Sequence, residues 1–206
     1  MTEVKICGLT RPEDVVAACE LGASLLGFNF VASSPRRLTV DRARRVARAA
    51  PPGVGRVGVF FRTEQEAMRR AIAEVPLDYV QLHRPVTAED VESLPVPIFA
   101  AVHVESGLGS VPPDEVLSRC RALLWDSSAG KGRRPDWSRV PPPTSLSVPV
   151  FVAGGLDDRT VGEVIRRLRP SGVDVASGVE SAPGIKDPAK LERFFAAVRE
   201  ADAQTR

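Results

Sequence analysis

Residues 148–178, VPVFVAGGLDDRTVGEVIRRLRPSGVDVASG, contain two short apolar runs separated by an amphipathic stretch. The runs VPVFVAGG and VDVASG have the length and apolar composition of strands that are buried on both faces. The stretch between them, DDRTVGEVIRRL, opens with polar capping residues and spaces its apolar residues as a helix does. This order predicts a strand, a helix and a second strand of a parallel sheet.

The same order repeats along the chain. Six earlier apolar runs resemble buried strands: VKIC, LLGFNF, RVGVFF, YVQLH, IFAAVHV and ALLWD. The other helical patterns are TRPEDVVAACELG, TVDRARRVARAA, TEQEAMRRAIAEV, TAEDVESL, PPDEVLSRC and DPAKLERFFAAV. The segment SSAGKGRRPDWSRVPPPTSLS, after ALLWD, has no clear helical pattern.

Eight strand and helix units predict an α/β fold, a single-domain (β/α)8 TIM barrel over residues 1–206. The alternative is an open, doubly wound sheet. Such a sheet usually has fewer strands and a glycine fingerprint after the first strand, and the sequence has no such fingerprint there.

Composition excludes several classes of protein. The 28 basic and 26 acidic residues leave a net charge of +2, which is not the footprint of a nucleic-acid-binding protein. Cys7, Cys19 and Cys120 form no CxxC pair and are odd in number, which argues against disulfides and zinc and favours a reducing cytosol. No apolar stretch approaches the ~20 residues that cross a bilayer. We expect a cytoplasmic protein that binds neither nucleic acid nor membrane.

Alternation along the strands predicts which side chains face the barrel interior. They are Lys5 and Cys7 on the first strand, Gln81 and His83 on the fourth, Leu124 and Asp126 on the sixth, and Asp174, Ala176 and Gly178 on the eighth. Chemistry in this fold belongs at the carboxyl ends of the strands. Cys7 and Asp126 are therefore expected at the same rim, across the barrel mouth.

Each polar residue at this rim also has a purely structural interpretation. Cys7 could be an inert core thiol, because free cysteine is among the most buried residue types. His83 could be a histidine whose hydrogen bonds are satisfied inside the barrel. Asp126 has no obvious helix to cap, because the glycine-containing DSSAGKG follows it. Lys5 and Asp174 should either pair across the first and eighth strands or bind a ligand, since an unpaired charge there is costly.

Two glycine loops point to a phosphorylated ligand. VAGGLDDRT follows the seventh strand and ASGVESAPG follows the eighth, where this fold builds phosphate sites from backbone amides. Gly154, Gly155 and Gly178 lack side chains that would keep an anion from the amides, and Ser177 adds a hydroxyl.

Several motifs, in order along nearly the whole chain, resemble the phosphoribosylanthranilate isomerase family of tryptophan biosynthesis. They are KICGLT, GFNFVASSPRRLT, VGVF, QLH, LLWDSSAGKGRRPDW, VAGGL and VDVASGVESAPGIKD. The resemblance implies a (β/α)8 barrel that uses no cofactor and no metal. It implies an Amadori rearrangement of N-(5-phosphoribosyl)anthranilate to 1-(2-carboxyphenylamino)-1-deoxyribulose 5-phosphate.

The resemblance also implies roles for individual residues. The general base falls on Cys7, the general acid on Asp126, and the arginine that binds the anthranilate carboxylate on Arg36, with Arg37 as a plausible substitute. We expect the phosphorylated substrate to contact Lys5, Arg36, Gln81, Gly132, Gly154, Gly155, Ser177 and Gly178.

These residues suit the chemistry. A rim carboxylic acid can protonate the ribose ring oxygen to open the ring. A thiolate whose pKa is lowered by the nearby cation of Lys5 can remove the proton from ribose C2.

The chain also departs from the family pattern. Arg84 replaces the glycine that usually follows QLH, and Ala129, Lys131 and Pro135 differ in the loop after Asp126. These changes leave the acid and base in place and bear on loop closure and substrate selectivity.

Three other functions are alternatives for such a barrel. One is a bifunctional or redirected sugar-phosphate isomerase, which usually carries paired strand-end aspartates; no second one follows the first strand here. Another is a non-catalytic barrel that binds a phosphate ligand, which should have lost Cys7 or Asp126. A Schiff-base aldolase fits poorly, because Lys5 is the only lysine on a strand. We expect a monomer or a homodimer.

Overall fold

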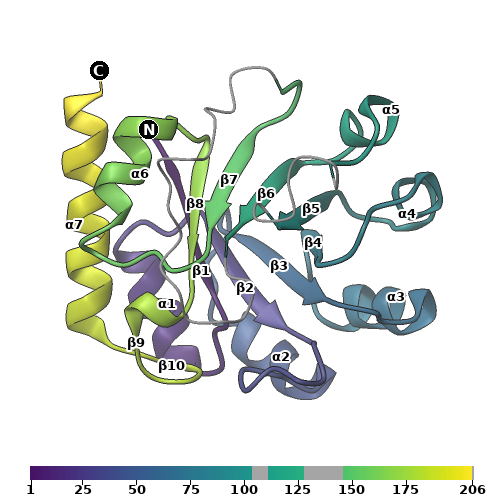
Figure 1. Ribbon diagram of the computed structural model, residues 1–206. Helices are drawn as coiled ribbons and strands as arrows, with labels where there is room; N and C mark the ends of the chain where they lie inside the picture. The colour runs from purple at the N-terminus through teal and green to yellow at the C-terminus, as the bar shows by residue number, and fades with distance from the viewer. Residues whose placement is uncertain (104–110, 128–145, 206) are drawn as a thin grey trace.

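Eight parallel strands close into a barrel in the computed structural model, which describes residues 1–103, 111–127 and 146–205 (Figure 1). The strands are β1 (Glu3–Cys7), β2 (Leu25–Asn29), β3 (Gly55–Phe60), β4 (Tyr79–Leu82), β5 (Ile98–His103), β6 (Ala122–Asp126), β7 (Val150–Ala153) and β8 (Gly172–Val175). Each strand pairs with the next, and β1 pairs with β8, with Lys5 opposite Asp174. The predicted barrel is confirmed.

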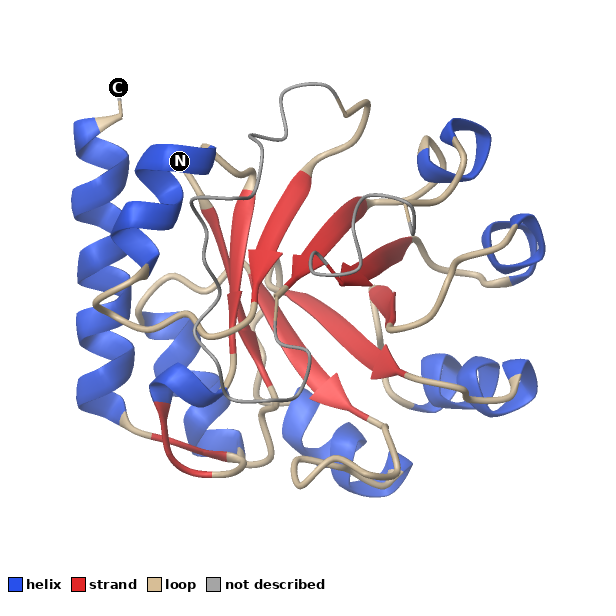
Figure 2. Ribbon diagram, in the orientation of Figure 1, coloured by secondary structure: helices blue, strands red, loops and turns tan. Residues whose placement is uncertain are grey.

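Helices surround the strands (Figure 2). They are α1 (Pro12–Glu20), α2 (Val40–Ala47), α3 (Gln65–Glu74), α4 (Ala88–Ser93), α5 (Asp114–Leu117), α6 (Val161–Leu168) and α7 (Pro188–Gln204). Polar residues begin several of them as the sequence predicts. The side chain of Thr87 accepts a hydrogen bond from the backbone N–H of Asp90 at α4, and that of Asp187 accepts one from Lys190 at α7.

The alternation of side chains along the strands produces two apolar cores. The smaller core fills the barrel interior with Leu25, Val57, Phe99, Ala101, Ala122, Leu124, Phe151 and Ala153. The larger core lies between the barrel and the helices and includes Ile6, Leu26, Val80, Leu123 and Val173. Neighbouring residues of one strand thus belong to different cores, which confirms the predicted alternation.

The eighth strand is shorter than predicted. It ends at Val175, Ala176 turns away with φ −123° and ψ −80°, and Ser177–Val179 form one turn of 3-10 helix. The expectation that Gly178 faces inward on this strand is therefore wrong. A Cβ at Gly178 would collide with the backbone carbonyl of Leu156, so the glycine permits close packing of two loops.

The turn of 3-10 helix is followed by a short antiparallel hairpin, which was not predicted from the sequence. It consists of β9 (Glu180–Ala182) and β10 (Ile185–Lys186), with Gly184 at φ +81° in the turn. Lys186 lies opposite Glu180 across this hairpin. Residues 128–145 lie outside the described residues. They include Gly132 and most of the segment for which the sequence predicts no helix.

Candidate active site

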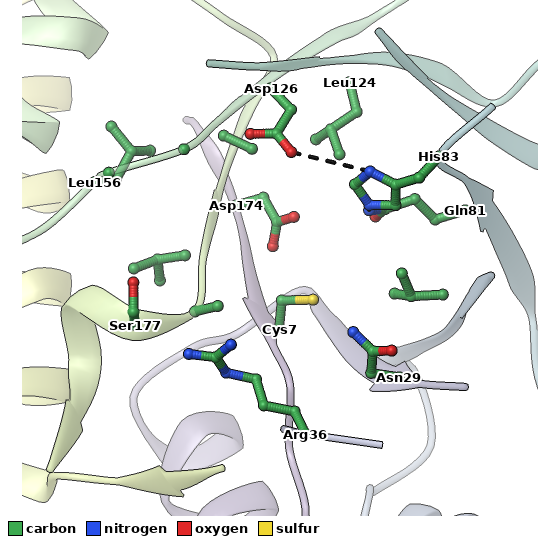
Figure 3. Close-up of a pocket in the computed structure, with 16 residues that line it drawn as sticks. Cys7, Asn29, Arg36, Gln81, His83, Leu124, Asp126, Leu156, Asp174 and Ser177 are labelled. Atoms are coloured by element: carbon green, nitrogen blue, oxygen red, sulfur yellow. Dashed lines mark hydrogen bonds and ion pairs between the residues drawn. The ribbon is translucent and has the colours of Figure 1, made fainter. Parts of the chain in front are cut away.

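A cavity of about 230 Å³ opens at the carboxyl ends of the barrel strands. Cys7 reaches it from the end of β1 and Asp126 from the end of β6. Figure 3 shows the two side chains on opposite sides of the cavity, with Asp174 between them. Alternation and strand order alone therefore predicted the placement of both residues at one mouth.

The thiol of Cys7 lies where the neighbouring strand provides space for it. Gly27 is its partner on β2, and a Cβ at that glycine would lie 2.7 Å from Sγ of Cys7. Burial raises the pKa of Cys7 above its ordinary value of 9.0, although the cation of Lys5 acts in the opposite direction. The expectation that Lys5 lowers the net pKa of Cys7 is therefore wrong for the protein without substrate, because desolvation outweighs the charge.

Lys5 forms a buried ion pair instead of facing the cavity. Its side chain is 0 % exposed, and Nζ donates to Oδ2 of Asp174 at 2.9 Å. Of the two predicted roles for this pair, the structure has the cross-strand ion pair, and Lys5 is not among the residues that line the cavity. Asp174 itself borders the cavity, and its Oδ1 has no hydrogen-bond partner among the described residues.

His83 and Gln81 lie beside the proposed acid. Nδ1 of His83 is 3.9 Å from Oδ2 of Asp126, and its Nε2 is 2.6 Å from the amide nitrogen of Gln81 (Figure 3). Burial lowers the pKa of His83 and so favours the neutral imidazole, although Asp126 acts in the opposite direction. With the Gln81 amide donating to Nε2, the imidazole proton lies on Nδ1, toward Asp126. All three residues line the cavity, so His83 is not a histidine hidden in the core.

Arg36 enters the cavity from the loop after β2, with its guanidinium between Cys7 and Ser177 (Figure 3). Its Nε and Nη2 donate to the two carboxylate oxygens of Glu180 at 2.8 and 2.6 Å. Gly8, at φ +75°, provides space for the stem of Arg36, which a Cβ there would meet. Arg37 is exposed and does not line the cavity, so Arg36 is the one of the two arginines that a ligand in the cavity can reach.

Two of the predicted phosphate-loop glycines and Ser177 lie at the cavity wall. Gly154 and Gly155 follow β7 with φ of +96° and +65°, a backbone conformation that glycine adopts without strain. Ser127 holds this turn from the end of β6, since its hydroxyl donates to the carbonyls of Ala153 and Gly154. Gly178 instead lines the outer side of the same loops.

Arg84, the departure from the family pattern after QLH, points away from the site. Its guanidinium donates to both carboxylate oxygens of Asp90, at 2.6 and 2.7 Å, at the start of α4. It therefore does not line the cavity.

Sequence reasoning missed Asn29, which lines the cavity, and the buried Glu180 and Lys186. The two charges flank a Pro-Gly turn in ESAPGIK, which is a hairpin signal that could have placed them opposite each other.

Within residues 1–103, 111–127 and 146–205, no three His, Cys, Asp or Glu side chains are grouped closely enough to hold a metal ion. Over the same residues, no helix combines the length and apolarity needed to cross a membrane.

Comparison with known proteins gives consistent matches. Residues 4–197 match the family model described as N-(5'phosphoribosyl)anthranilate (PRA) isomerase. The N-(5'-phosphoribosyl)anthranilate isomerase of Pseudomonas putida (strain GB-1) is 41% identical over 202 residues, covering 96% of this chain and 97% of the relative.

Solved structures match over the same span. Phosphoribosyl anthranilate isomerase from Thermus thermophilus has a TM-score of 0.85 at 36% identity, over 97% of this chain and 99% of that one. A phosphoribosyl anthranilate isomerase in complex with reduced 1-(o-carboxyphenylamino)-1-deoxyribulose 5-phosphate has a TM-score of 0.83 at 33% identity, over 97% and 100% of the two chains.

Proposed function

This chain belongs to the N-(5'-phosphoribosyl)anthranilate isomerase family, and from that premise we propose that Cys7 and Asp126 are the base and acid of its reaction. The enzyme is an isomerase of tryptophan biosynthesis. It converts N-(5-phosphoribosyl)anthranilate into 1-(2-carboxyphenylamino)-1-deoxyribulose 5-phosphate. The observation that carries the assignment is that a thiol and a carboxyl face one cavity from opposite strands of the barrel.

The two charged ends of the substrate have matching groups at the cavity wall. The turn at Gly154 and Gly155, together with Ser177, suits the phosphate, because glycines let an anion approach backbone N–H groups closely. Arg36 suits the anthranilate carboxylate, because a guanidinium binds a carboxylate through two parallel hydrogen bonds. A substrate bound at both ends spans the cavity between Cys7 and Asp126.

The first chemical step opens the ribose ring. Asp126, in its protonated form, donates a proton to the ring oxygen. The bond between C1 and that oxygen breaks, and the lone pair of the anthranilate nitrogen forms a C1=N bond, giving a protonated Schiff base. His83 presents Nδ1–H toward the Asp126 carboxylate that remains, which stabilises the negative charge.

The second step removes the proton from C2. Cys7, as thiolate, takes this proton, and the electron pair of the C–H bond forms C1=C2 while the Schiff-base nitrogen becomes neutral. The resulting enolamine gains a proton at C1 and loses the one on its C2 hydroxyl, which gives the aminoketose product. Asp174 and Gln81 line the cavity, and Oδ1 of Asp174 and Oε1 of Gln81 are buried without hydrogen-bond partners among the described residues.

We further propose a cytoplasmic location and a monomeric or homodimeric state. The three cysteines are free thiols, which suits a reducing compartment. The protein needs no cofactor or metal in this mechanism, because each step transfers only protons and electron pairs between substrate and side chains.

The test is decay of substrate fluorescence when purified protein is added to freshly made phosphoribosylanthranilate in EDTA. Cys7→Ser and Asp126→Asn should each lower kcat by about a hundredfold or more. Cys19→Ser, at a half-buried cysteine on α1, is the matched control and should keep wild-type activity. No decay above the spontaneous background with the wild type would exclude the isomerase and favour a phosphate-binding role.

A further inference from the structure

Two buried charges on the β9–β10 hairpin have no role in the proton transfers. The side chains of Glu180 and Lys186 are 4 % and 0 % exposed, and they form an ion pair with Nζ 3.0 Å from Oε1. Desolvating two charges is costly unless each finds several partners. The partners of this pair therefore indicate what it positions.

Glu180 holds Arg36 along one side of its guanidinium. Nε and Nη2 of Arg36 donate to the two oxygens of Glu180, and the backbone N–H of Gly184 also donates to Oε1 at 3.2 Å. A guanidinium has five N–H groups in a rigid plane. With the Nε side bound to Glu180, the edge formed by Nη1 and the second hydrogen of Nη2 remains for another planar carboxylate.

Lys186 connects this arginine to the backbone of the proposed base. Its ammonium donates to the carbonyl of Cys7 at 2.6 Å, to the carbonyl of Ala176 at 3.1 Å and to Glu180. The parallel pairing of β1 with β8 extends to Ile6 and Val175, immediately before these two carbonyls. The side chain of Lys186 therefore links β1 and β8 by hydrogen bonds just beyond the point where their backbone pairing ends.

The charges of the cluster leave one positive charge for the ligand. Arg36 and Lys186 contribute two positive charges and Glu180 one negative charge, so the sum matches a single carboxylate. Glu180 thus has two opposing effects: its charge weakens the field of Arg36, but its oxygens fix the orientation of the guanidinium. Removing the charge distinguishes these effects, because they change substrate binding in opposite directions.

We propose that Glu180, held by Lys186, is a positioning residue that fixes the free edge of Arg36 toward the cavity and so makes the enzyme select substrates with a carboxylate ortho to the amine. This inference rests on the proposed function, because it assumes that Arg36 binds the anthranilate carboxylate. The role is one of orientation: Glu180 acts through Arg36 and does not contact the reacting atoms.

The experiment compares Glu180→Gln with wild type on two substrates, phosphoribosylanthranilate and the analogue made from aniline, which lacks the carboxylate. Conversion is followed by chromatographic separation of substrate and ketose. With the carboxylated substrate, KM should rise about tenfold or more while kcat changes little, since ground-state and transition-state binding are lost together. With the aniline analogue, kcat/KM of variant and wild type should agree within about twofold, because that substrate offers no group to Arg36.

Opposite results would overturn the proposal. A fall in KM for the carboxylated substrate would mean that the charge of Glu180 affects binding more than its orientation of Arg36 does. An equal loss of kcat/KM on both substrates would mean that Glu180 has a structural role. Glu180→Asp is the second variant: it keeps the charge but is too short to hold both nitrogens, so it should also raise KM for the carboxylated substrate alone.

A matched control separates folding from orientation. Asp90→Asn removes a similar buried carboxylate that binds Arg84 through two hydrogen bonds, away from the cavity, and should leave KM unchanged. If Asp90→Asn unfolds cooperatively but neither Glu180 variant does, the role of Glu180 is structural and the proposal is wrong. Wild type that does not convert phosphoribosylanthranilate contradicts the proposed function itself, whereas active wild type with unaffected Glu180 variants contradicts only this inference.

Discussion

Replacing Lys186 by methionine tests how much one side chain, at the junction of β1 and β8, contributes to the free energy of unfolding. Methionine has nearly the same length and fills the same volume, so the change removes the ammonium and leaves the packing close to native. Three acceptors lose a hydrogen bond: the carbonyls of Cys7 and Ala176 and the carboxylate of Glu180.

The size of the effect follows from those three bonds. A hydrogen bond from a charged group contributes about 1.5–3 kcal/mol net, so three contribute roughly 5–9 kcal/mol. Burial of the ammonium offsets part of this sum, and the same burial lowers the pKa of Lys186 although Glu180 acts in the opposite direction. We expect Lys186→Met to lower the free energy of unfolding by about 3–5 kcal/mol, as is usual when one partner of a buried ion pair is removed.

Urea and thermal unfolding, followed by far-ultraviolet circular dichroism, measure this change. For a chain of this length, about 3–5 kcal/mol corresponds to a fall in Tm of roughly 6–20 °C. Lys190→Met is the matched control: it removes one hydrogen bond from a half-buried lysine to the backbone carbonyl of Glu180, and should cost about 1 kcal/mol. Equal losses for the two variants, or less than about 1 kcal/mol for Lys186→Met, would refute the reasoning.

Two further predictions concern the thiol and the loops. Burial raises the pKa of Cys7, so the pH midpoints of its alkylation by iodoacetamide and of the rising limb of kcat/KM should lie above the ordinary thiol value of 9.0. Stopped-flow alkylation of a variant that lacks Cys19 and Cys120 measures the first midpoint. A midpoint below 9.0 contradicts the prediction. Gly178→Ala should destabilise the protein by about 2 kcal/mol or more, because its Cβ meets a backbone carbonyl of the neighbouring loop. Gly162→Ala, in the first turn of α6, should change stability by less than about 0.5 kcal/mol, because its Cβ meets only the end of the flexible Arg166 side chain. Thermal unfolding compares the two glycine variants, and equal shifts would contradict the packing argument.

The barrel was predictable because each strand repeats one physical requirement. Strands such as β6 and β7 must be apolar on both sides, one side facing the interior core and the other the helices, so their sequences are apolar runs, interrupted only by Asp126 at the end of β6. Alternation along such a run then fixes which residues face inward. Cys7 and Asp126 were therefore predicted to lie at one mouth from strand period alone, and the family resemblance was needed only for their chemical roles.

Other features of the site depend on contacts between distant parts of the chain, which no local pattern encodes. The pKa of Cys7 depends on how completely the thiol is desolvated, and the cation two residues away at Lys5 gave the opposite expectation. The end of β8 depends on the close approach of Gly178 to the loop after β7. Arg36 could be identified from the family motif, but its partner Glu180 is 144 positions away.

The hydrogen bond between Lys186 and Cys7 joins residues 179 positions apart in the chain. During synthesis at about 5–20 residues per second, the cysteine precedes this lysine by roughly 10–35 s. Through that interval the first strand has neither Lys186 nor β8 beside it, so the geometry around the thiol is incomplete in every nascent chain. We therefore expect catalytic competence to arise in one step when the last strand and its hairpin close the barrel, rather than gradually as the chain lengthens.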